Sequence, residues 1–236
     1  MCILNEINIF MKIAILLPGQ PRFAKDFENF LKNLQGYDQA DWFCYLTNNN
    51  RVDDVSPDVR ISKEWMNFNV EEGRKKLESF LPSNNYIQSF EISNCETVFC
   101  PTIPRQSHYK GWYNIFKANE LRRNSGIEYD IIIRARADVG INHPFDLRSI
   151  DRKKLEESII MPSNQWAGIG HLQSCDQFAI ANSKNMNVYA DLYNQVTIHQ
   201  KEYFFNYNPE ALLALHLLKN NIPTVKENFS ISLRWA

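Results

Sequence analysis

The residues best suited to chemistry follow a strongly apolar stretch near the middle of this 236-residue chain. Three consecutive isoleucines at residues 131–133 predict a strand buried on both faces, and Arg134, Arg136 and Asp138 come directly after it. Charges in that position lie at the carboxyl edge of an α/β sheet, where such sheets bind ligands. Two guanidinium groups can grip a diphosphate, and a carboxylate can hold a metal ion or a sugar hydroxyl. The alternative is an ordinary strand end solvated by salt-bridged charges.

A second candidate position follows the first apolar run, residues 12–17. Gly19 allows the backbone to approach a ligand, and Arg22 can contact a base, a ribose or a phosphate, although a simple turn would use the same residues. The segment is neither a P-loop nor a Gly-x-Gly-x-x-Gly motif, which argues against a kinase, an ATPase or a dehydrogenase.

A third candidate position is the start of the helix predicted over residues 106–123. Gln106 and Lys110 lie in its first turns, where the helix N-terminus favours anions and a lysine adds positive charge. A solvated helix entry is the alternative.

Alternating apolar strands and amphipathic helices must position these residues, and they predict one α/β domain with a mostly parallel sheet flanked by helices. Strands are expected at residues 12–17, 42–46, 86–92, 131–134, 159–161 and 178–181, with strand character again over 222–233. Helices are expected at residues 23–34, 70–80, 106–123, 183–196 (capped by Ser183) and 211–218 (opened by Pro209 and Glu210). Residues 165–175 are expected to form a loop with Gly168 and Gly170 as flexible points.

The chain length suits a single domain. Because Met11 directly precedes the first strand, residues 1–10 are expected to be an extension of a domain spanning 11–236. Residues 11–138 would form its nucleotide-binding half and residues 139–236 its acceptor-binding half.

Composition narrows the function classes further. A formal net charge of −1 gives no support for binding nucleic acid or an anionic membrane. The five cysteines include no Cys-x-x-Cys pair and are expected to be free thiols, so with no recognisable signal sequence or membrane span a cytoplasmic protein is predicted. Aromatic residues make up 13% of the chain, which suits a carbohydrate-binding cleft but equally an ordinary core.

Taken in order, the motifs resemble those of small GT-A-fold glycosyltransferases of bacterial and large-DNA-virus type. The similarity covers most of residues 11–222, and a viral member would act in the host cytoplasm. Its elements are a strand followed by Pro-Gly-x-x-Arg, an aromatic-rich helix, Tyr-Asp-x-x-x-Arg-x-Arg-x-Asp, Asp-Gln-Phe, and Pro-Glu before a Leu-rich helix.

The resemblance implies a GT-A-like (Rossmann-like) fold and a donor diphosphate held by Mn²⁺ or Mg²⁺ at an Asp-x-Asp-like position. Here that position is Asp138, but Arg136 replaces the first aspartate of the pair. Two outcomes are therefore open, and we favour the first, with Asp138 as the metal ligand. Asp138 binds Mn²⁺ or Mg²⁺ together with the diphosphate, or Arg134 and Arg136 neutralise the leaving group in place of a metal.

An acceptor-activating carboxylate is also implied, and the candidates are Glu210 and Asp176. Glu210 opens a predicted helix, whose dipole favours the ionised form, and it matches the acidic residue that opens the family's helix. Asp176 precedes a strand and can instead contact donor-sugar hydroxyls together with Gln177. We expect Glu210 to be the base and Asp176 the sugar ligand.

The remaining polar residues are less informative. The spacing of the five histidines matches no zinc motif. His216 lies on the apolar stretch of the last helix and is expected to be a packed, hydrogen-bonded core residue. His171 and Trp166 fall in the predicted loop, where Trp166 could stack on a sugar or simply cover the core.

The leading hypothesis is a glycosyltransferase that moves a sugar from a nucleotide-diphosphate donor, with UDP as the expected nucleotide, to a glycan acceptor. A sugar nucleotidyltransferase is one alternative, but it usually carries a longer Gly-rich loop with Gly-Thr-Arg, which this chain lacks. A non-catalytic nucleotide-sugar-binding domain is the other, supported by the missing first aspartate.

Overall fold

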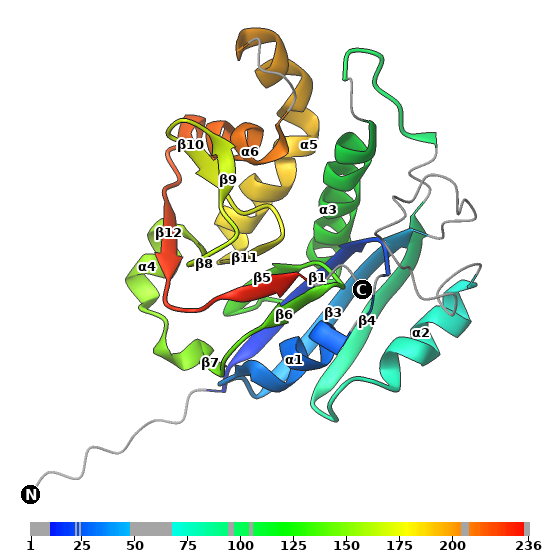
Figure 1. Cartoon of the computed structure of the whole chain (residues 1–236). Coiled ribbons are helices and arrows are strands. Elements are labelled where there is room, and N and C mark those ends of the chain that lie inside the picture. The colour runs from blue at the N-terminus through cyan, green and yellow to red at the C-terminus, as the bar shows by residue number, and fades with distance from the viewer. Residues whose placement is uncertain are drawn as a thin grey trace, which may run out of the picture.

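The structure, a computed structural model, describes residues 10–21, 23, 25–47, 68–93, 97–103, 106–203 and 208–233. Its centre is a seven-stranded sheet (Figure 1). The strand order is β12 (Thr224–Glu227), β8 (Ile159–Pro162), β11 (Phe178–Ala181), β5 (Ile131–Ala135), β1 (Lys12–Gly19), β3 (Gln39–Thr47) and β4 (Asn85–Ser93). The expected α/β class and mostly parallel sheet are therefore confirmed.

Two features of this sheet decide where a ligand could bind. The chain builds outward from β1 through β3 to β4 on one side, and places β5 on the other side. This reversal makes the carboxyl ends of β1 and β5 a topological switch point, the usual ligand position in open α/β sheets. In the register of these two strands Leu16 lies opposite Arg134, and β1 continues beyond that pair to Gly19.

Strand β11 runs antiparallel to both of its neighbours, β5 and β8, whereas the other strand pairs of this sheet are parallel. Its first residue, Phe178, lies opposite Ala135 at the end of β5. An antiparallel strand starts where its neighbour ends, so the residues just before β11 are brought to the carboxyl edge beside Arg134 and Arg136.

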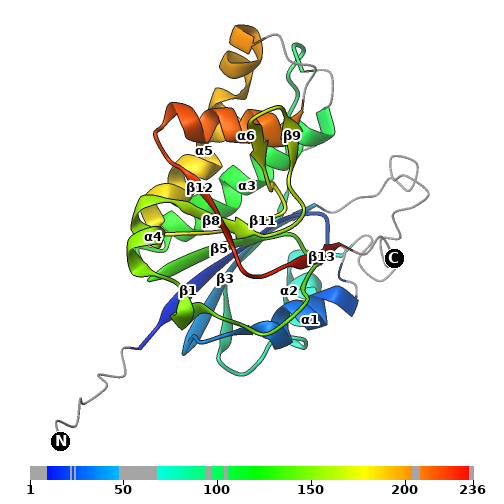
Figure 2. The same ribbon diagram turned by 60° about the vertical axis from the view of Figure 1, so that its left-hand side comes forward.

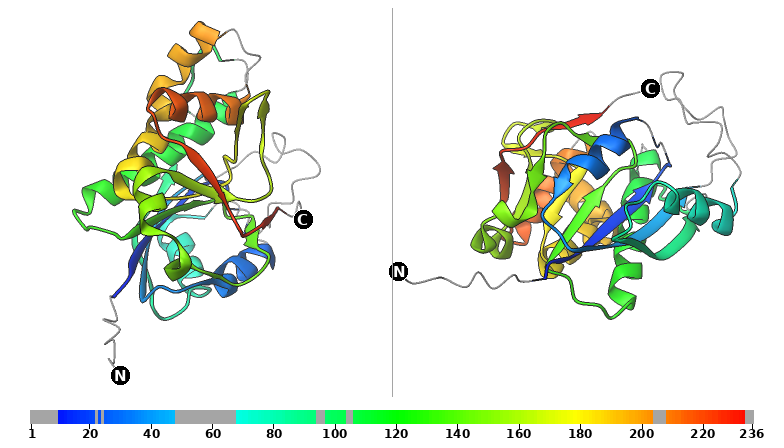
Figure 3. Two further views of the ribbon diagram at one scale, coloured as in Figure 1. Left: turned by 90° about the vertical axis from the view of Figure 1, so that its left-hand side faces the viewer. Right: turned by 90° about the horizontal axis from the view of Figure 1, so that it is seen from below.

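Helices cover both faces of the sheet (Figures 2 and 3). Helices α1 (Lys25–Asn33) and α2 (Val70–Glu78) lie on one face, and α3 (Gln106–Asn124) and α5 (Ser183–Tyr203) on the other. Helix α6 (Pro209–Lys219) packs on α5, while the short α4 (Arg152–Glu157) lies near β8 and β11. One main hydrophobic core includes residues from both expected halves of the chain, from Met11 to Ile231.

The second half contains short elements that the sequence pattern did not predict. They are β6 (Val139–Ile141), β7 (Phe145–Asp146) and the 3₁₀ turn Leu147–Ser149. Strand β6 pairs with β13 (Ile231–Leu233), which lies in the region of predicted strand character, and β7 pairs with β2 (Leu34–Gln35) of the first half. The predicted loop over residues 165–175 is instead a β-hairpin of β9 (Ala167–Ile169) and β10 (Leu172–Ser174), which lies beside α6 (Figure 1). Gly170 supplies the positive φ of its turn.

Two helix boundaries also differ from the prediction. Asn182, not Ser183, caps α5, because its side-chain oxygen accepts a 2.8 Å hydrogen bond from the backbone N–H of Asn185. The helix then continues past residue 196 to Tyr203. Its last turns remain packed, since His199 is buried and contacts His216 of α6 across 3.0 Å.

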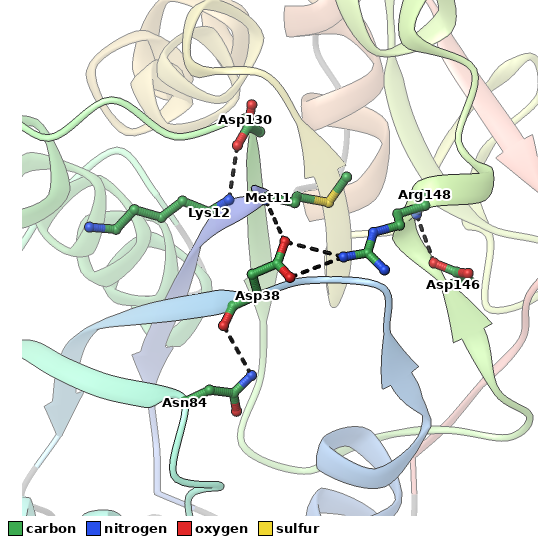
Figure 4. A network of polar contacts seen from close by, with 7 residues as sticks. All are labelled: Met11, Lys12, Asp38, Asn84, Asp130, Asp146 and Arg148. Carbon is green, nitrogen blue, oxygen red and sulfur yellow. Dashed lines mark hydrogen bonds and ion pairs between the residues drawn. The ribbon is translucent and has the colours of Figure 1, made fainter. Parts of the chain in front are cut away.

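The amino edge of the sheet holds a network of paired charges (Figure 4). The Asp38 carboxylate accepts a 2.6 Å hydrogen bond from the backbone N–H of Met11 and bonds of 3.1 and 3.2 Å from the Arg148 guanidinium. Asp130 accepts a 2.9 Å bond from the backbone N–H of Lys12. These contacts tie the start of β1 to the segments that enter β3 and β5.

Asp41 on β3 adds a fully buried charge at this same edge. Its carboxylate receives Lys12 Nζ at 2.9 Å, the Tyr129 hydroxyl at 2.8 Å and the Gln39 amide at 2.8 Å. Burial by itself raises the pKa of Asp41, but the bonds from Gln39, Lys12 and Tyr129 lower it overall. The side chain is therefore held as a paired carboxylate.

Candidate functional site

Arg134 is placed at the carboxyl edge by the buried strand β5. Only 5% of the residue is exposed, and its Nη1 donates to the main-chain oxygen of Asp176. Its Nε has no hydrogen-bond partner among the described residues. A buried guanidinium N–H without a partner is costly, so Arg134 is the kind of side chain that a bound anion would satisfy.

Arg136 forms a two-bond ion pair with Asp138. The Nε of Arg136 donates to one carboxylate oxygen at 2.8 Å, and its Nη2 donates to the other at 2.6 Å. The backbone N–H of Arg136 bonds to the Gln177 carbonyl at 3.2 Å, which fixes the turn after β5 against the start of β11. Burial by itself lowers the pKa of Arg136, but the Asp138 carboxylate, with a smaller contribution from Asp176, raises it overall.

Asp176 and Gln177 reach the same edge because β11 is antiparallel. The main-chain oxygen of Asp176 accepts from Arg134 and, at 3.5 Å, from the Tyr189 hydroxyl of α5. Both bonds use the main chain of Asp176, so its side chain takes no part in them. The Oε1 atom of Gln177 is buried without a hydrogen-bond partner in the described part of the chain. Both residues are half-buried at the edge where Arg134 lies.

Glu210 enters from the other end of the chain, in the first turn of α6. Asn208 caps this helix through a 2.8 Å bond from the backbone N–H of Ala211, and Pro209 occupies the first helical position. The Ser174 hydroxyl of β10 donates to the Glu210 carbonyl at 2.7 Å, so the hairpin holds this turn in place.

The electrostatic environment of Glu210 links it to the residues after β5. Burial raises the pKa of Glu210 above its usual range, and the nearby charge of Asp176 raises it further. Arg136 offsets part of this rise. Glu210 is consequently a stronger base than a solvent-exposed glutamate, within electrostatic reach of both Asp176 and Arg136.

The other predicted donor-binding residues are Gly19, Arg22, Gln106 and Lys110. Gly19 ends β1 with a φ of 96°, and a side chain there would meet no neighbour within 4 Å, so the backbone borders open space. Arg22 lies outside the described residues. The Gln106 amide is engaged with the backbone of residues 100 and 103, so its contacts are local. Lys110 lies half-buried in the second turn of α3.

Three residues near this edge escaped the sequence analysis. Thr47 ends β3, is 7% exposed, and its hydroxyl has no hydrogen-bond partner among the described residues. Ser174 and Tyr189 support Glu210 and Asp176 through the bonds given above. Thr47 directly follows a predicted strand, which is the signal that could have identified it; the supporting residues carried no such signal.

The fit of a divalent cation depends mainly on Asp138. Both of its oxygens accept bonds from Arg136, and its side chain is 6% exposed. Within the described ranges, no three His, Cys, Asp or Glu side chains gather closely enough to hold a metal ion. Because a hard cation requires several oxygen ligands, the arrangement of these residues does not fit a preformed Mn²⁺ or Mg²⁺ site.

The histidines and the tryptophan are also accounted for. His216 is 2% exposed, contacts His199 and donates from Nε2 to the Val188 carbonyl at 2.7 Å, which confirms the predicted core role. His171 is exposed on the hairpin. Trp166 is partly buried against the core, donates to the Pro162 carbonyl at 2.6 Å and lies under the Lys226 ammonium.

The arrangement as a whole offers cationic, carboxylate and amide groups along one edge of the sheet.

Among the helices of the described residues, none combines the length and apolarity that crossing a membrane requires. A scan against protein-family models finds no match, and a search of curated proteins finds no relative. The chemistry of this site therefore carries the functional argument.

Proposed function

We propose that this protein is a glycosyltransferase of GT-A-like fold that moves a sugar from a nucleoside-diphosphate donor to a hydroxyl of a glycan acceptor. One observation carries the proposal. Arg134 near the end of β5, Arg136 just after it, the Asp176–Gln177 pair before β11 and Glu210 at the start of α6 are brought to the carboxyl edge, at the topological switch point between β1 and β5. Such an edge can bind an anionic leaving group and a neutral sugar side by side.

The leaving group determines the role of the arginines. When the bond between the anomeric carbon and the diphosphate breaks, negative charge develops on the diphosphate oxygen. Arg134 and Arg136 would stabilise that charge, Arg134 with its buried Nε and Arg136 with its exposed part. Gln177 and Asp176 would bind the hydroxyls of the donor sugar, which are donors and acceptors suited to an amide and a carboxylate.

Glu210 would serve as the general base. The acceptor hydroxyl attacks the anomeric carbon, its proton passes to the Glu210 carboxylate, and the nucleoside diphosphate departs with the bonding electrons. The raised pKa of Glu210 suits this role, because a base is most effective when its pKa approaches the working pH. The hydrogen bond from Ser174 to the Glu210 carbonyl keeps the first turn of α6 oriented.

A panel of nucleotide sugars tests the proposal, with UDP-sugars first, each added to the full chain with EDTA or with Mg²⁺. Selective thermal stabilisation by one donor, followed by release of its nucleoside diphosphate, is the expected result. Release of pyrophosphate from a nucleoside triphosphate and a sugar phosphate would indicate a nucleotidyltransferase. Donor binding without turnover across a broad glycan acceptor panel would indicate a non-catalytic domain, and the lack of any stabilisation would contradict the proposal.

A further inference from the structure

We propose that the diphosphate is bound by Arg134 and Arg136 without a divalent cation, and that Asp138 is a positioning residue for Arg136. The inference rests on the proposed function only for the identity of the ligand as a nucleoside diphosphate. The anion site itself is argued from the geometry of three residues.

The first argument is the geometry of the ion pair. Arg136 and Asp138 pair through two nearly equal bonds of 2.8 and 2.6 Å, which fixes the plane of the guanidinium. The pair uses the Nε and Nη2 edge of the guanidinium. The carboxylate is almost completely buried, whereas the arginine side chain is 23% exposed, so Asp138 supports the guanidinium from behind. A supported side chain of this kind is pre-organised for a ligand.

The second argument is the neighbouring arginine. Arg134 is the next-to-last residue of β5, and Arg136 directly follows the strand, so the two arginines lie close together at its carboxyl end. Only 5% of Arg134 is exposed, and its Nε lacks a hydrogen-bond partner among the described residues. An unsatisfied N–H beside a second guanidinium points to an oxyanion ligand, since a diphosphate presents several acceptor oxygens.

The third argument concerns the competing cation. A metal at Asp138 would have to break both bonds to Arg136, leaving a guanidinium beside the incoming positive charge. No other two carboxylates of the described chain complete a metal-binding group with Asp138. The guanidinium thus takes the place that a metal would occupy against the carboxylate.

Isothermal titration calorimetry with inorganic pyrophosphate tests the cation requirement directly. The wild-type chain is titrated in EDTA and in Mg²⁺, and we expect binding in both conditions with affinities within about twofold. When Mn²⁺ is titrated without pyrophosphate, we expect the wild-type chain and Asp138→Asn to give the same result, because Asp138 does not bind the cation. Pyrophosphate binding that occurs only with Mg²⁺ would overturn the inference. This comparison of EDTA with Mg²⁺ uses the wild-type chain alone, so it does not depend on the folding of a variant.

A double-mutant cycle tests the role of Asp138. We expect Arg136→Met to weaken pyrophosphate binding by about ten- to a hundredfold, the loss typical of a charge-assisted contact. The matched control is Arg123→Met, a change at an exposed arginine near the end of α3, which should leave binding unchanged. Removing the Asp138 charge by itself favours an anion, so weaker binding by Asp138→Asn would report lost orientation.

The cycle separates the two roles of Asp138. If Asp138 positions Arg136, Asp138→Asn weakens pyrophosphate binding by the same factor in EDTA and in Mg²⁺, and it has no effect on binding when Arg136 is already replaced by Met. A metal ligand gives a factor only in Mg²⁺, and the factor persists without Arg136. Tighter binding by Asp138→Asn, or a factor independent of Arg136, overturns the positioning role.

The inference and the proposed function can fail separately. Cation-independent pyrophosphate binding without sugar transfer would retain the anion site and reject the transferase. Transfer that requires Mn²⁺ would retain the transferase and reject the arginine-only site.

Discussion

The two edges of the central sheet use the same types of residue in opposite ways. At the amino edge, Asp38, Asp41 and Asp130 each accept from identified donors across short distances. At the carboxyl edge, Arg134 and Gln177 keep buried polar atoms that have no partner among the described residues. One edge is satisfied internally, whereas the other has hydrogen-bonding capacity that a ligand can use.

The pKa shifts differ between the edges in the same sense. Asp41 has a lowered pKa, because the hydrogen bonds around it outweigh its burial. Glu210 has a raised pKa, because burial and the charge of Asp176 outweigh Arg136. A carboxylate that its neighbours stabilise supports the fold, and one that its neighbours destabilise is available as a base. This contrast teaches that the hydrogen-bond partners of a buried carboxylate, more than the number of charges nearby, distinguish the two edges.

The largest expected effect is loss of turnover at the carboxyl edge. Glu210→Gln should reduce sugar transfer by about 10²–10⁴-fold, the usual contribution of a general base, while donor affinity is retained. Steady-state kinetics and a donor titration on the same preparation measure the two quantities. Glu157→Gln, an exposed change in α4, is the control that should keep full activity. Near-normal turnover of Glu210→Gln would transfer the role of base to Asp176.

The next effect belongs to the amino edge. Asp41→Ala should lower the free energy of unfolding by about 3 kcal/mol, because Lys12, Gln39 and Tyr129 lose a shared buried acceptor. Tyr129→Phe removes one bond to the same carboxylate and should cost about 1.5 kcal/mol. Urea denaturation measures both changes. Pyrophosphate affinity should remain unchanged in both variants, and a large loss of affinity would show that the two edges are coupled.

A smaller effect is expected in the pH dependence of stability, with opposite signs at the two edges. The folded-state pKa of Asp41 is lowered, so its stabilisation is present above its unfolded-state pKa and is lost as the pH falls toward the folded-state value. Asp41→Asn should therefore flatten the acid limb of the stability profile.

The folded-state pKa of Glu210 is raised, so the folded chain binds more protons between the ordinary and the raised value. Stability should decline as the pH rises through that window. Glu210→Gln should remove this decline and be the more stable form above the window. Urea denaturation of the wild type and both variants at a series of pH values gives the comparison, and parallel profiles would contradict it.

The smallest effect is expected for the exposed ion pair at the amino edge. Arg148→Met removes the ion pair with Asp38, whose side chain is 32% exposed. The Asp38 carboxylate still accepts the hydrogen bond from the backbone N–H of Met11. The midpoint of thermal unfolding should fall less than in Asp41→Ala, and the difference from wild type should shrink as salt is added. A salt-independent loss would indicate a packing role for the arginine stem.

The predictability of the fold varied along the chain. The long strands from residue 12 to residue 135 were predicted within a few positions, because apolar runs between turn residues leave little ambiguity, whereas the two-residue β2 was missed. The elements from Val139 to Ser174 were mostly missed, since strands of two or three residues carry no readable period. The hairpin at residues 167–174 depends on its packing against α6, a contact that local sequence does not encode.

Some features of this protein follow from the sequence alone, because they depend on neighbours along the chain. The apolar run at residues 131–133 forms a buried strand, so Arg134, Arg136 and Asp138 must lie at or just after its end. In the same way, Asn208 and Pro209 start a helix that has Glu210 in its first turn. These are short-range consequences of burial and capping.

Other features were decided only by the tertiary structure. Apolar periodicity carries no direction, so only the folded sheet made β11 antiparallel and brought Asp176 and Gln177 to the arginines. From the sequence, either Asp138 would bind a metal or Arg134 and Arg136 would act in its place, and only the folded turn shows that Asp138 is paired with Arg136. Packing of α6 on the hairpin and on α5 then placed Glu210 within electrostatic reach, because long-range contacts set the distances between charges.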